Sequence, residues 1–223
     1  MIYELANILY TPGNIEAGRK YLSGRKINPD NLKFPVVLTD TNSEPFNCFR
    51  RLYHPNTFTE CAFFPIVDFE NPTYLIGFDV RYIGKDPTRL RYHKFKINPQ
   101  TFLLYFTQEL DKIDPNKPML VTEGFVDAET LRELGYPVIS PLTAMHSLKF
   151  CAFLKAISNK IYICYDNDEA GKKAVLKIMQ EVSIDPNFKR SFNFLNYSGK
   201  DPNQAANDYG KEYLHTVLKG QIV

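Results

Sequence analysis

The sequence predicts an α/β protein in which an N-terminal mixed α+β subdomain precedes a domain built on a parallel sheet. In the second half, short apolar strands alternate with amphipathic helices, which is typical of a parallel sheet covered by helices. In the first half, aromatic and β-branched runs between Pro, Asn and Gly indicate strands in a mixed order. The polar, proline-punctuated segment 111–118 predicts a linker, so we expect domains over residues 1–115 and 116–223.

The first half is expected to begin with a short helix over residues 15–23. Its strands are expected over residues 48–53, 61–69, 74–83 and 90–97. A second helix, over residues 102–110, is then expected to lead into the linker.

The second half is expected to alternate regularly between strands and helices. The strands are expected over residues 119–122, 138–139, 161–165 and 192–195. The helices are expected over residues 127–134, 145–157, 169–182, 203–209 and 212–218. Gly135 is well placed to end the first of these helices. In such a sheet, ligands gather beyond the carboxyl ends of the strands.

The composition is that of an ordinary globular protein, with 223 residues of which 44% are hydrophobic and 14% aromatic. The net charge of +2 excludes a strongly basic DNA coat protein, although it leaves enzymes that segregate acidic and basic residues. The 4 cysteines form no C-x-x-C pair, which favours reduced core thiols over a zinc ribbon. Neither a signal sequence nor a membrane-spanning apolar run is present, so we expect a protein of the cytoplasm.

Acidic side chains follow three of the predicted strands. Glu123 ends the first strand, and Asp127 falls in the first turn of the next helix. Asp166 and Asp168 directly follow an apolar strand, and Asp201 comes after the last strand. Because parallel strands end at one edge of a sheet, we expect these carboxylates to meet. Like charges so close repel unless a cation neutralises them, so the pattern predicts a divalent metal site.

Asp201 also has a simpler interpretation, because Pro202 follows it. An Asp before a Pro is typical of the residue that caps a helix N-terminus. Taken alone, the pattern favours the cap, and its part in the metal site depends on the other acids.

Basic residues in the first half indicate contacts with phosphate. Arg81, Arg89, Arg91 and Lys94 lie in a run with aromatic residues. Arginine can contact phosphate through two donors, and aromatic rings can stack on unpaired bases. Alternation along a strand is expected to place Arg89, Arg91 and His93 on one face. A solvated strand face explains the same pattern, and both interpretations stay open.

The acidic motifs resemble those of the Toprim domain, which bacterial-type primases share with type IA and II topoisomerases and some nucleases. Glu123-Gly124 matches the Glu-Gly turn of that family, and Asp166 and Asp168 match its Asp-x-Asp. The runs at 121–127, 163–171 and 199–202 resemble those of DnaG-type primases in particular. Residues 64–68 and 75–81 are similar to an upstream primase segment that topoisomerases lack.

The resemblance implies the core of a DNA primase, which joins ribonucleotides into short RNA primers on single-stranded DNA. It implies that Glu123, Asp166 and Asp168 are catalytic. The expected metal ligands, for Mg²⁺ or Mn²⁺ and not for zinc, are Glu123, Asp127, Asp166, Asp168 and Asp201. The residues expected to bind nucleotide or template are Arg81, Arg89, Arg91, Lys94 and Lys200.

The implied partners are single-stranded DNA, ribonucleoside triphosphates, a replicative helicase and a zinc-binding module on another chain, with no membrane. Neither a zinc ribbon nor the G-x-x-x-x-G-K-[ST] loop of a helicase occurs in the sequence. We therefore expect either a compact viral or plasmid-encoded core, acting in the host cytoplasm if viral, or a truncated chain.

Some positions depart from the primase pattern. Asp79-Val80 stands where the family has Gly-Gly before its arginine, and the family's substrate segment is replaced at 88–94. Asn203 stands where the family has another Asp. An amide oxygen can still ligate a metal, but this change is expected to weaken a second metal position.

Two other functions remain open. A Toprim nuclease would use the same carboxylates and metal to activate water, although the upstream primase-like segment argues against it. A non-catalytic nucleic-acid-binding or replisome adaptor would keep the fold without turnover. Asn203 and the replaced glycines support the adaptor, whereas the crowded Glu123, Asp166 and Asp168 argue against it.

Overall fold

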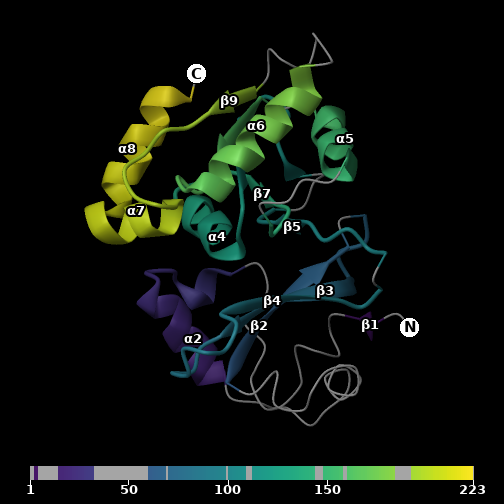
Figure 1. Ribbon diagram of the computed structural model, residues 1–223, viewed down its shortest axis with the longest axis vertical. Coiled ribbons are helices and arrows are strands. Elements are labelled where there is room, and N and C mark those ends of the chain that lie inside the picture. The colour runs from purple at the N-terminus through teal and green to yellow at the C-terminus, as the bar shows by residue number, and fades with distance from the viewer. Residues whose placement is uncertain are drawn as a thin grey trace. The chain divides into compact units, whose positions relative to one another are not determined.

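The computed structural model describes residues 3–4, 15–32, 60–68, 70–98, 100–108, 112–143, 148–157, 160–183 and 192–222. The chain divides into two compact units, Met1–Leu103 and Leu104–Val223, each with its own sheet (Figure 1). The expected strand at 48–53 lies outside the described residues. Among the described helices, none has the length and apolar character needed to span a membrane.

The first unit contains a four-stranded antiparallel sheet within the described residues. Its long strand β3, Tyr74–Tyr82, pairs with β2, Cys61–Val67, along most of its length. β3 also pairs with β1, Tyr3–Glu4, and with β4, Tyr92–Lys96. The helix α2, Ile15–Gly24, and the 3₁₀ turn η1, Pro29–Asn31, complete the described part of this unit.

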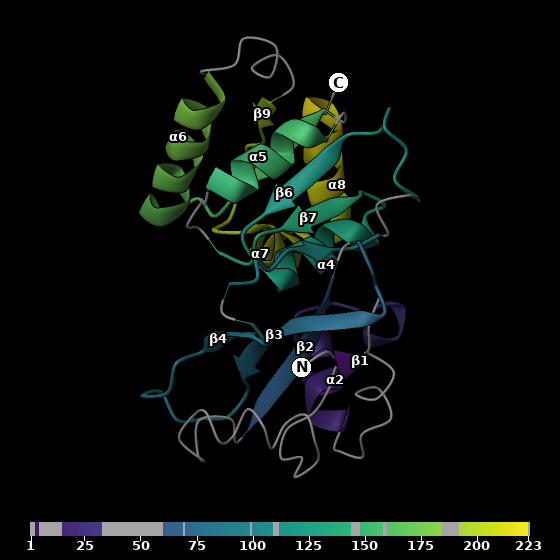
Figure 2. The same ribbon diagram turned by 90° about the vertical axis from the view of Figure 1, so that its right-hand side faces the viewer.

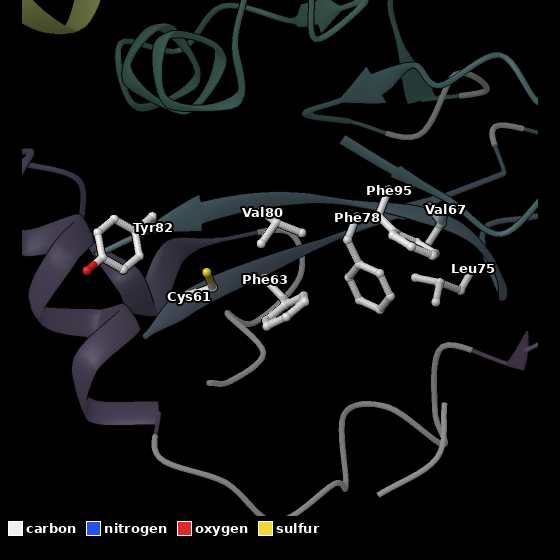
Figure 3. Close-up of a cluster of buried hydrophobic side chains, with 8 residues drawn as sticks. All are labelled: Cys61, Phe63, Val67, Leu75, Phe78, Val80, Tyr82 and Phe95. Atoms are coloured by element: carbon white, nitrogen blue, oxygen red, sulfur yellow. The ribbon is translucent and has the colours of Figure 1, made fainter. Parts of the chain in front are cut away.

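One face of this sheet carries the apolar core of the unit. Its buried members, shown in Figure 3, are Cys61, Phe63, Val67, Leu75, Phe78, Val80, Tyr82 and Phe95. The rings of Phe63 and Phe78 meet edge to face with centroids 5.8 Å apart. On the other face, Phe64 of β2 lies near Tyr21 of α2, with ring centroids 6.3 Å apart. The alternation of side chains along each strand accounts for both layers.

The second unit contains a five-stranded sheet in the order β5-β7-β6-β8-β9 within the described residues. Four strands are parallel: β6, Met119–Thr122; β7, Val138–Ser140; β8, Ile161–Cys164; and β9, Phe192–Phe194. β5, Tyr105–Phe106, runs antiparallel to β7 at one edge.

Helices cover both faces of this second sheet. The helices α5, Leu148–Ala156, and α6, Glu169–Ser183, lie together on one face (Figures 1 and 2). The other face is covered by α4, Phe125–Glu133, α7, Pro202–Tyr209, and α8, Lys211–Gln221. Since β7 and β8 flank β6, the direction of winding reverses at β6, and a ligand crevice is expected at such a point.

The structure confirms the expected fold class and corrects one element. Residues 102–110 were expected to form a helix, but Tyr105–Phe106 is the strand β5 and no helix covers the described part of this segment. Residues 103–106 are all buried. A helix that packs on a sheet buries only one of its faces, so it would leave some of these successive side chains exposed. Along the chain, the boundary between the two compact units falls between Leu103 and Leu104, so the expected linker at 111–118 lies inside the second unit.

Candidate metal and nucleotidyl-transfer site

Two neighbouring parallel strands bring Glu123 and Asp166 together. Thr122 of β6 lies opposite Cys164 of β8, so both strands end at the same level of the sheet. Oε1 of Glu123 accepts a hydrogen bond of 3.2 Å from the backbone N–H of Asp166. Glu123 and Asp166, which are far apart in the sequence, therefore lie together at the strand ends, as the pattern predicted.

Asp168 begins the helix α6 and stays ionised. Its Oδ1 accepts hydrogen bonds from the backbone N–H groups of Ala170, at 3.0 Å, and Gly171, at 2.9 Å. The hydrogen bond from Gly171 is the main reason that the pKa of Asp168 is lowered, and contacts with Lys200 lower it further. Asp168 thus supplies a fixed negative charge beside Glu123 and Asp166.

Burial raises the pKa of Glu123 and of Asp166, whereas the pKa of Asp168 is lowered. Burial and the nearby charge of Asp166 raise the pKa of Glu123 to about 7. The pKa of Asp166 is also raised, first by burial and then by the charge of Asp201. Carboxyl groups with such different environments at one strand edge are typical of a catalytic site.

Gly171 permits this crowding, although sequence reasoning did not single it out. A Cβ atom at this position would lie 2.0 Å from the backbone oxygen of Asp166 and 2.8 Å from Oε1 of Glu123. Glycine therefore lets the first turn of α6 approach the strand ends. A Gly placed three residues after the second Asp is a signal in the sequence that could have indicated this role.

Lys200 lies against the acidic group. Its Nζ is 3.2 Å from Oδ2 of Asp168 and 3.5 Å from Oδ2 of Asp166. The side chain of Asn167 fixes the loop that carries Lys200, because its Nδ2 donates to the carbonyl oxygens of Tyr197, at 3.0 Å, and Gly199, at 2.7 Å. Sequence reasoning did not predict this role for Asn167.

Asp201 lies at the N-terminus of the helix α7. Asp201 caps α7 by accepting a hydrogen bond of 2.6 Å from the N–H of Gln204, so the cap interpretation is correct. Its charge nevertheless raises the pKa of Asp166, which places it near the acidic group.

Asp127 and Asn203 join α4 to α7. Oδ1 of Asp127 accepts from the backbone N–H of Asn203 at 3.1 Å, and Nδ2 of Asn203 donates to Oγ1 of Thr130 at 2.9 Å. Asn203 is buried. These contacts give both residues a role in packing, and their role as metal ligands stays a prediction.

The donors in this site suit a hard cation. The carboxylate oxygens of Asp166 and Asp168 are ligands of the kind that Mg²⁺ takes together with water and phosphate oxygens. No group of three or more His, Cys, Asp or Glu side chains in the described ranges is spaced to hold a metal ion as it stands. The ammonium of Lys200 contacts both Asp residues and supplies a positive charge there.

The basic residues of the first unit are divided between two faces of its sheet. The register places Arg81 opposite Tyr92 and Asp79 opposite Lys94, so these four share a face. His93 is opposite Val80 on the face of the apolar core. The expected common face for Arg89, Arg91 and His93 is not formed along a strand, because β4 begins only at Tyr92.

Arg81 and Arg89 each lie over an aromatic ring. The guanidinium of Arg81 is 5.5 Å from the ring centroid of Tyr92, and that of Arg89 is 4.3 Å from the ring of Tyr82. Buried Asp79, which replaces a family glycine, accepts hydrogen bonds from Nε and Nη2 of Arg81 at 3.0 and 2.8 Å. Asp79 therefore sets the orientation of Arg81.

The fold and the acidic edge define a Toprim-type domain, and residues 120–206 match the Toprim-like family. The chain is, more particularly, similar to DnaG-type primases over most of its length. It is 30% identical to the DNA primase of Escherichia coli K12 over 202 residues, which are 86% of this chain and 32% of that protein. The chain thus spans about a third of the length of that relative.

Solved primase structures share the fold. A structure of the DnaG catalytic core matches with a TM-score of 0.75 and 20% identity, over 98% of this chain and 77% of that one. The DnaG catalytic domain bound to single-stranded DNA matches with a TM-score of 0.71 and 20% identity, over 97% and 74%. Other matched primases include one with a zinc-binding domain and a fragment of a primase-helicase protein. The chain therefore has the fold of the DnaG catalytic core.

Proposed function

We propose that this chain is the catalytic core of a DNA primase, which synthesises short RNA primers on single-stranded DNA. The observation that carries the proposal is the meeting of Glu123 and Asp166, with Asp168 beside them, where β6 and β8 end. The similarity to DNA primases over most of the chain supports this reaction in preference to others of the Toprim group.

The proposed cofactor is Mg²⁺, or Mn²⁺ in its place, in keeping with the metal dependence of Toprim primases as a family. Asp166 and Asp168 would hold the cation, and Asp127 and Asp201 are further candidate ligands. When bound, a divalent cation stabilises the negative charge on the attacking and leaving oxygens of the transferred phosphoryl group.

Glu123 is the residue that we propose to handle the proton. In nucleotidyl transfer, a ribose 3′-hydroxyl attacks the α-phosphate, its proton leaves, and pyrophosphate is released. A pKa of about 7 allows Glu123 to accept a proton near neutral pH, where both of its protonation states are populated. Its partial burial beside Asp166 maintains this pKa.

The basic residues of the first unit are proposed to bind template and nucleotide phosphates. Arg81, Arg89, Arg91 and Lys94 supply the charge, and the exposed ring of Tyr92 beside Arg81 offers a surface on which a base can stack. Single-stranded DNA and ribonucleoside triphosphates are therefore the proposed substrates. A helicase and a zinc-binding module are proposed as partners, since one matched primase structure contains a zinc-binding domain and another is a fragment of a primase-helicase protein.

The test is primer synthesis from labelled ribonucleotides on single-stranded DNA with Mg²⁺ or Mn²⁺. The unaltered chain is expected to yield oligoribonucleotides, and Asp166→Asn and Asp168→Asn are expected to yield none. Asn at 168 still offers an oxygen to the N–H groups of Ala170 and Gly171, so the melting temperature should stay nearly unchanged. Unimpaired synthesis by both variants would exclude this site.

The same assay separates the two other functions. Shortened DNA without added ribonucleotides would identify a nuclease that uses the same carboxylates. Binding of single-stranded DNA without synthesis, also in the presence of zinc-module and helicase partners, would identify an adaptor. Either result would replace the primase proposal.

A further inference from the structure

The ammonium of Lys200 contacts both carboxylates that are proposed to hold the metal. Nζ is 3.2 Å from Oδ2 of Asp168 and 3.5 Å from Oδ2 of Asp166. A single positive charge thus neutralises half of the charge of this pair. A divalent cation bound to the same two oxygens would repel the ammonium at these distances, so both cannot remain there.

The backbone of Lys200 is held firmly, whereas its side chain is not. The N–H of Asn167 donates to the carbonyl oxygen of Lys200 at 2.6 Å, and the N–H of Lys200 contacts Oε1 of Gln204 at 3.3 Å. The side chain of Lys200 is 54% exposed, and exposed ion pairs of lysine are weak. The ammonium can therefore leave the carboxylates by rotation of its own side chain while its backbone stays in place.

We propose that Lys200 is an internal counter-ion that competes with the divalent cation for Asp166 and Asp168. Cation binding releases the ammonium to the triphosphate of the incoming nucleotide. This inference rests on the proposed function, because it assigns the metal and the nucleotide to that site. It gives Lys200 two opposite effects: it weakens the binding of the cation alone, and it strengthens the binding of nucleotide once the cation is present.

The physical reason is that the ammonium of Lys200 is attracted to different anions before and after the cation binds. Without the cation, the carboxylate pair is the anion nearest to Lys200. With the cation, the pair is neutralised, and a triphosphate bound at the cation becomes the nearest anion. Since the loop is fixed by Asn167, the released ammonium remains within reach of the site.

The first test measures Mn²⁺ binding to the full chain without nucleotide or DNA, by electron paramagnetic resonance or calorimetry. Lys200→Gln should bind Mn²⁺ about three- to tenfold more tightly, as expected for the loss of the two ion pairs made by this exposed lysine. Lys172→Gln is the control, because it also removes one positive charge. Lys172 pairs with Glu169 at 3.7 Å, and both residues belong to α6. The Mn²⁺ affinity of Lys172→Gln should change by less than about twofold.

The second test measures the binding of a ribonucleoside triphosphate with and without Mg²⁺. Lys200→Gln should lose nucleotide affinity with Mg²⁺ and keep the affinity of the unaltered chain without it. Such a difference is a coupling between two ligands through one residue, and it must be reciprocal.

Clear outcomes overturn the inference. If the Mn²⁺ affinity of Lys200→Gln is unchanged or lower, Lys200 does not compete with the cation for Asp166 and Asp168. The same conclusion follows if Lys172→Gln raises the Mn²⁺ affinity equally. Loss of nucleotide affinity that is the same with and without Mg²⁺ shows that no release takes place. Neither test measures primer synthesis, so a chain that shows both effects but makes no primer would contradict the proposed function alone.

Discussion

Replacement of Gly171 by alanine probes the geometry of the site directly. The added Cβ would lie 2.0 Å from the backbone oxygen of Asp166, whereas real Cβ contacts are essentially never shorter than 3.0 Å. The first turn of α6 or the end of β8 must therefore move by about 1 Å, the difference between these distances. Oε1 of Glu123, at 2.8 Å from the added atom, must also shift, which disturbs its hydrogen bond to the N–H of Asp166.

The expected effect on activity is larger than the effect on stability. Overpacking of this kind costs about 1–3 kcal/mol, and the higher helix propensity of alanine offsets about 1 kcal/mol of that. A net loss of about 1 kcal/mol lowers the melting temperature by only about 2–4 °C in a chain of this size. Displacement of catalytic groups by about 1 Å can lower the rate by about a hundredfold.

The assay compares primer synthesis and thermal unfolding of Gly171→Ala with those of Gly220→Ala. Gly220 also lies in a helix, α8, and a Cβ there meets no atom within 4 Å. The control should keep full activity and gain up to about 1 kcal/mol of stability. Full activity of Gly171→Ala would refute the argument that close approach of α6 holds Glu123 and Asp166 in place.

Three further predictions address pH, the loop and the basic face. Burial raises the pKa of Glu123 in the folded state from 4.5 to about 7, so the metal-free protein should lose stability relative to Glu123→Gln as the pH rises from 4.5 to about 7. A difference in melting temperature that does not change with pH would contradict this. Asn167→Gly should lower the free energy of unfolding by about 1–3 kcal/mol in urea titrations, because it removes the hydrogen bonds to the carbonyl oxygens of Tyr197 and Gly199. An unchanged urea midpoint would show that these two hydrogen bonds do not stabilise the fold. Asp79→Asn should steepen the salt dependence of single-stranded DNA binding by about 0.7 units of log–log slope, because Asp79 would no longer neutralise the charge of Arg81. An unchanged slope would remove Arg81 from the DNA path.

The sequence alone was sufficient to predict the fold class and the acidic edge. The alternation of apolar strands and amphipathic helices after residue 118 depends on local periodicity, and parallel strands necessarily end together. Glu123, Asp166 and Asp168 could therefore be assigned to one place before any coordinates were known. The strand Tyr105–Phe106 could not be assigned from the sequence, because a short apolar run is compatible with either a helix or a strand until its partner β7 is known.

Only the tertiary structure decided how the site is held together. The bonds of Asn167 to the loop before Lys200, the contact of Lys200 with two carboxylates and the close approach at Gly171 all join segments from different strands and helices. Such contacts depend on distances between side chains that are remote in the sequence, and local patterns carry no information about these distances. The raised pKa of Glu123 has the same origin, because burial and neighbouring charge exist only once the chain has folded.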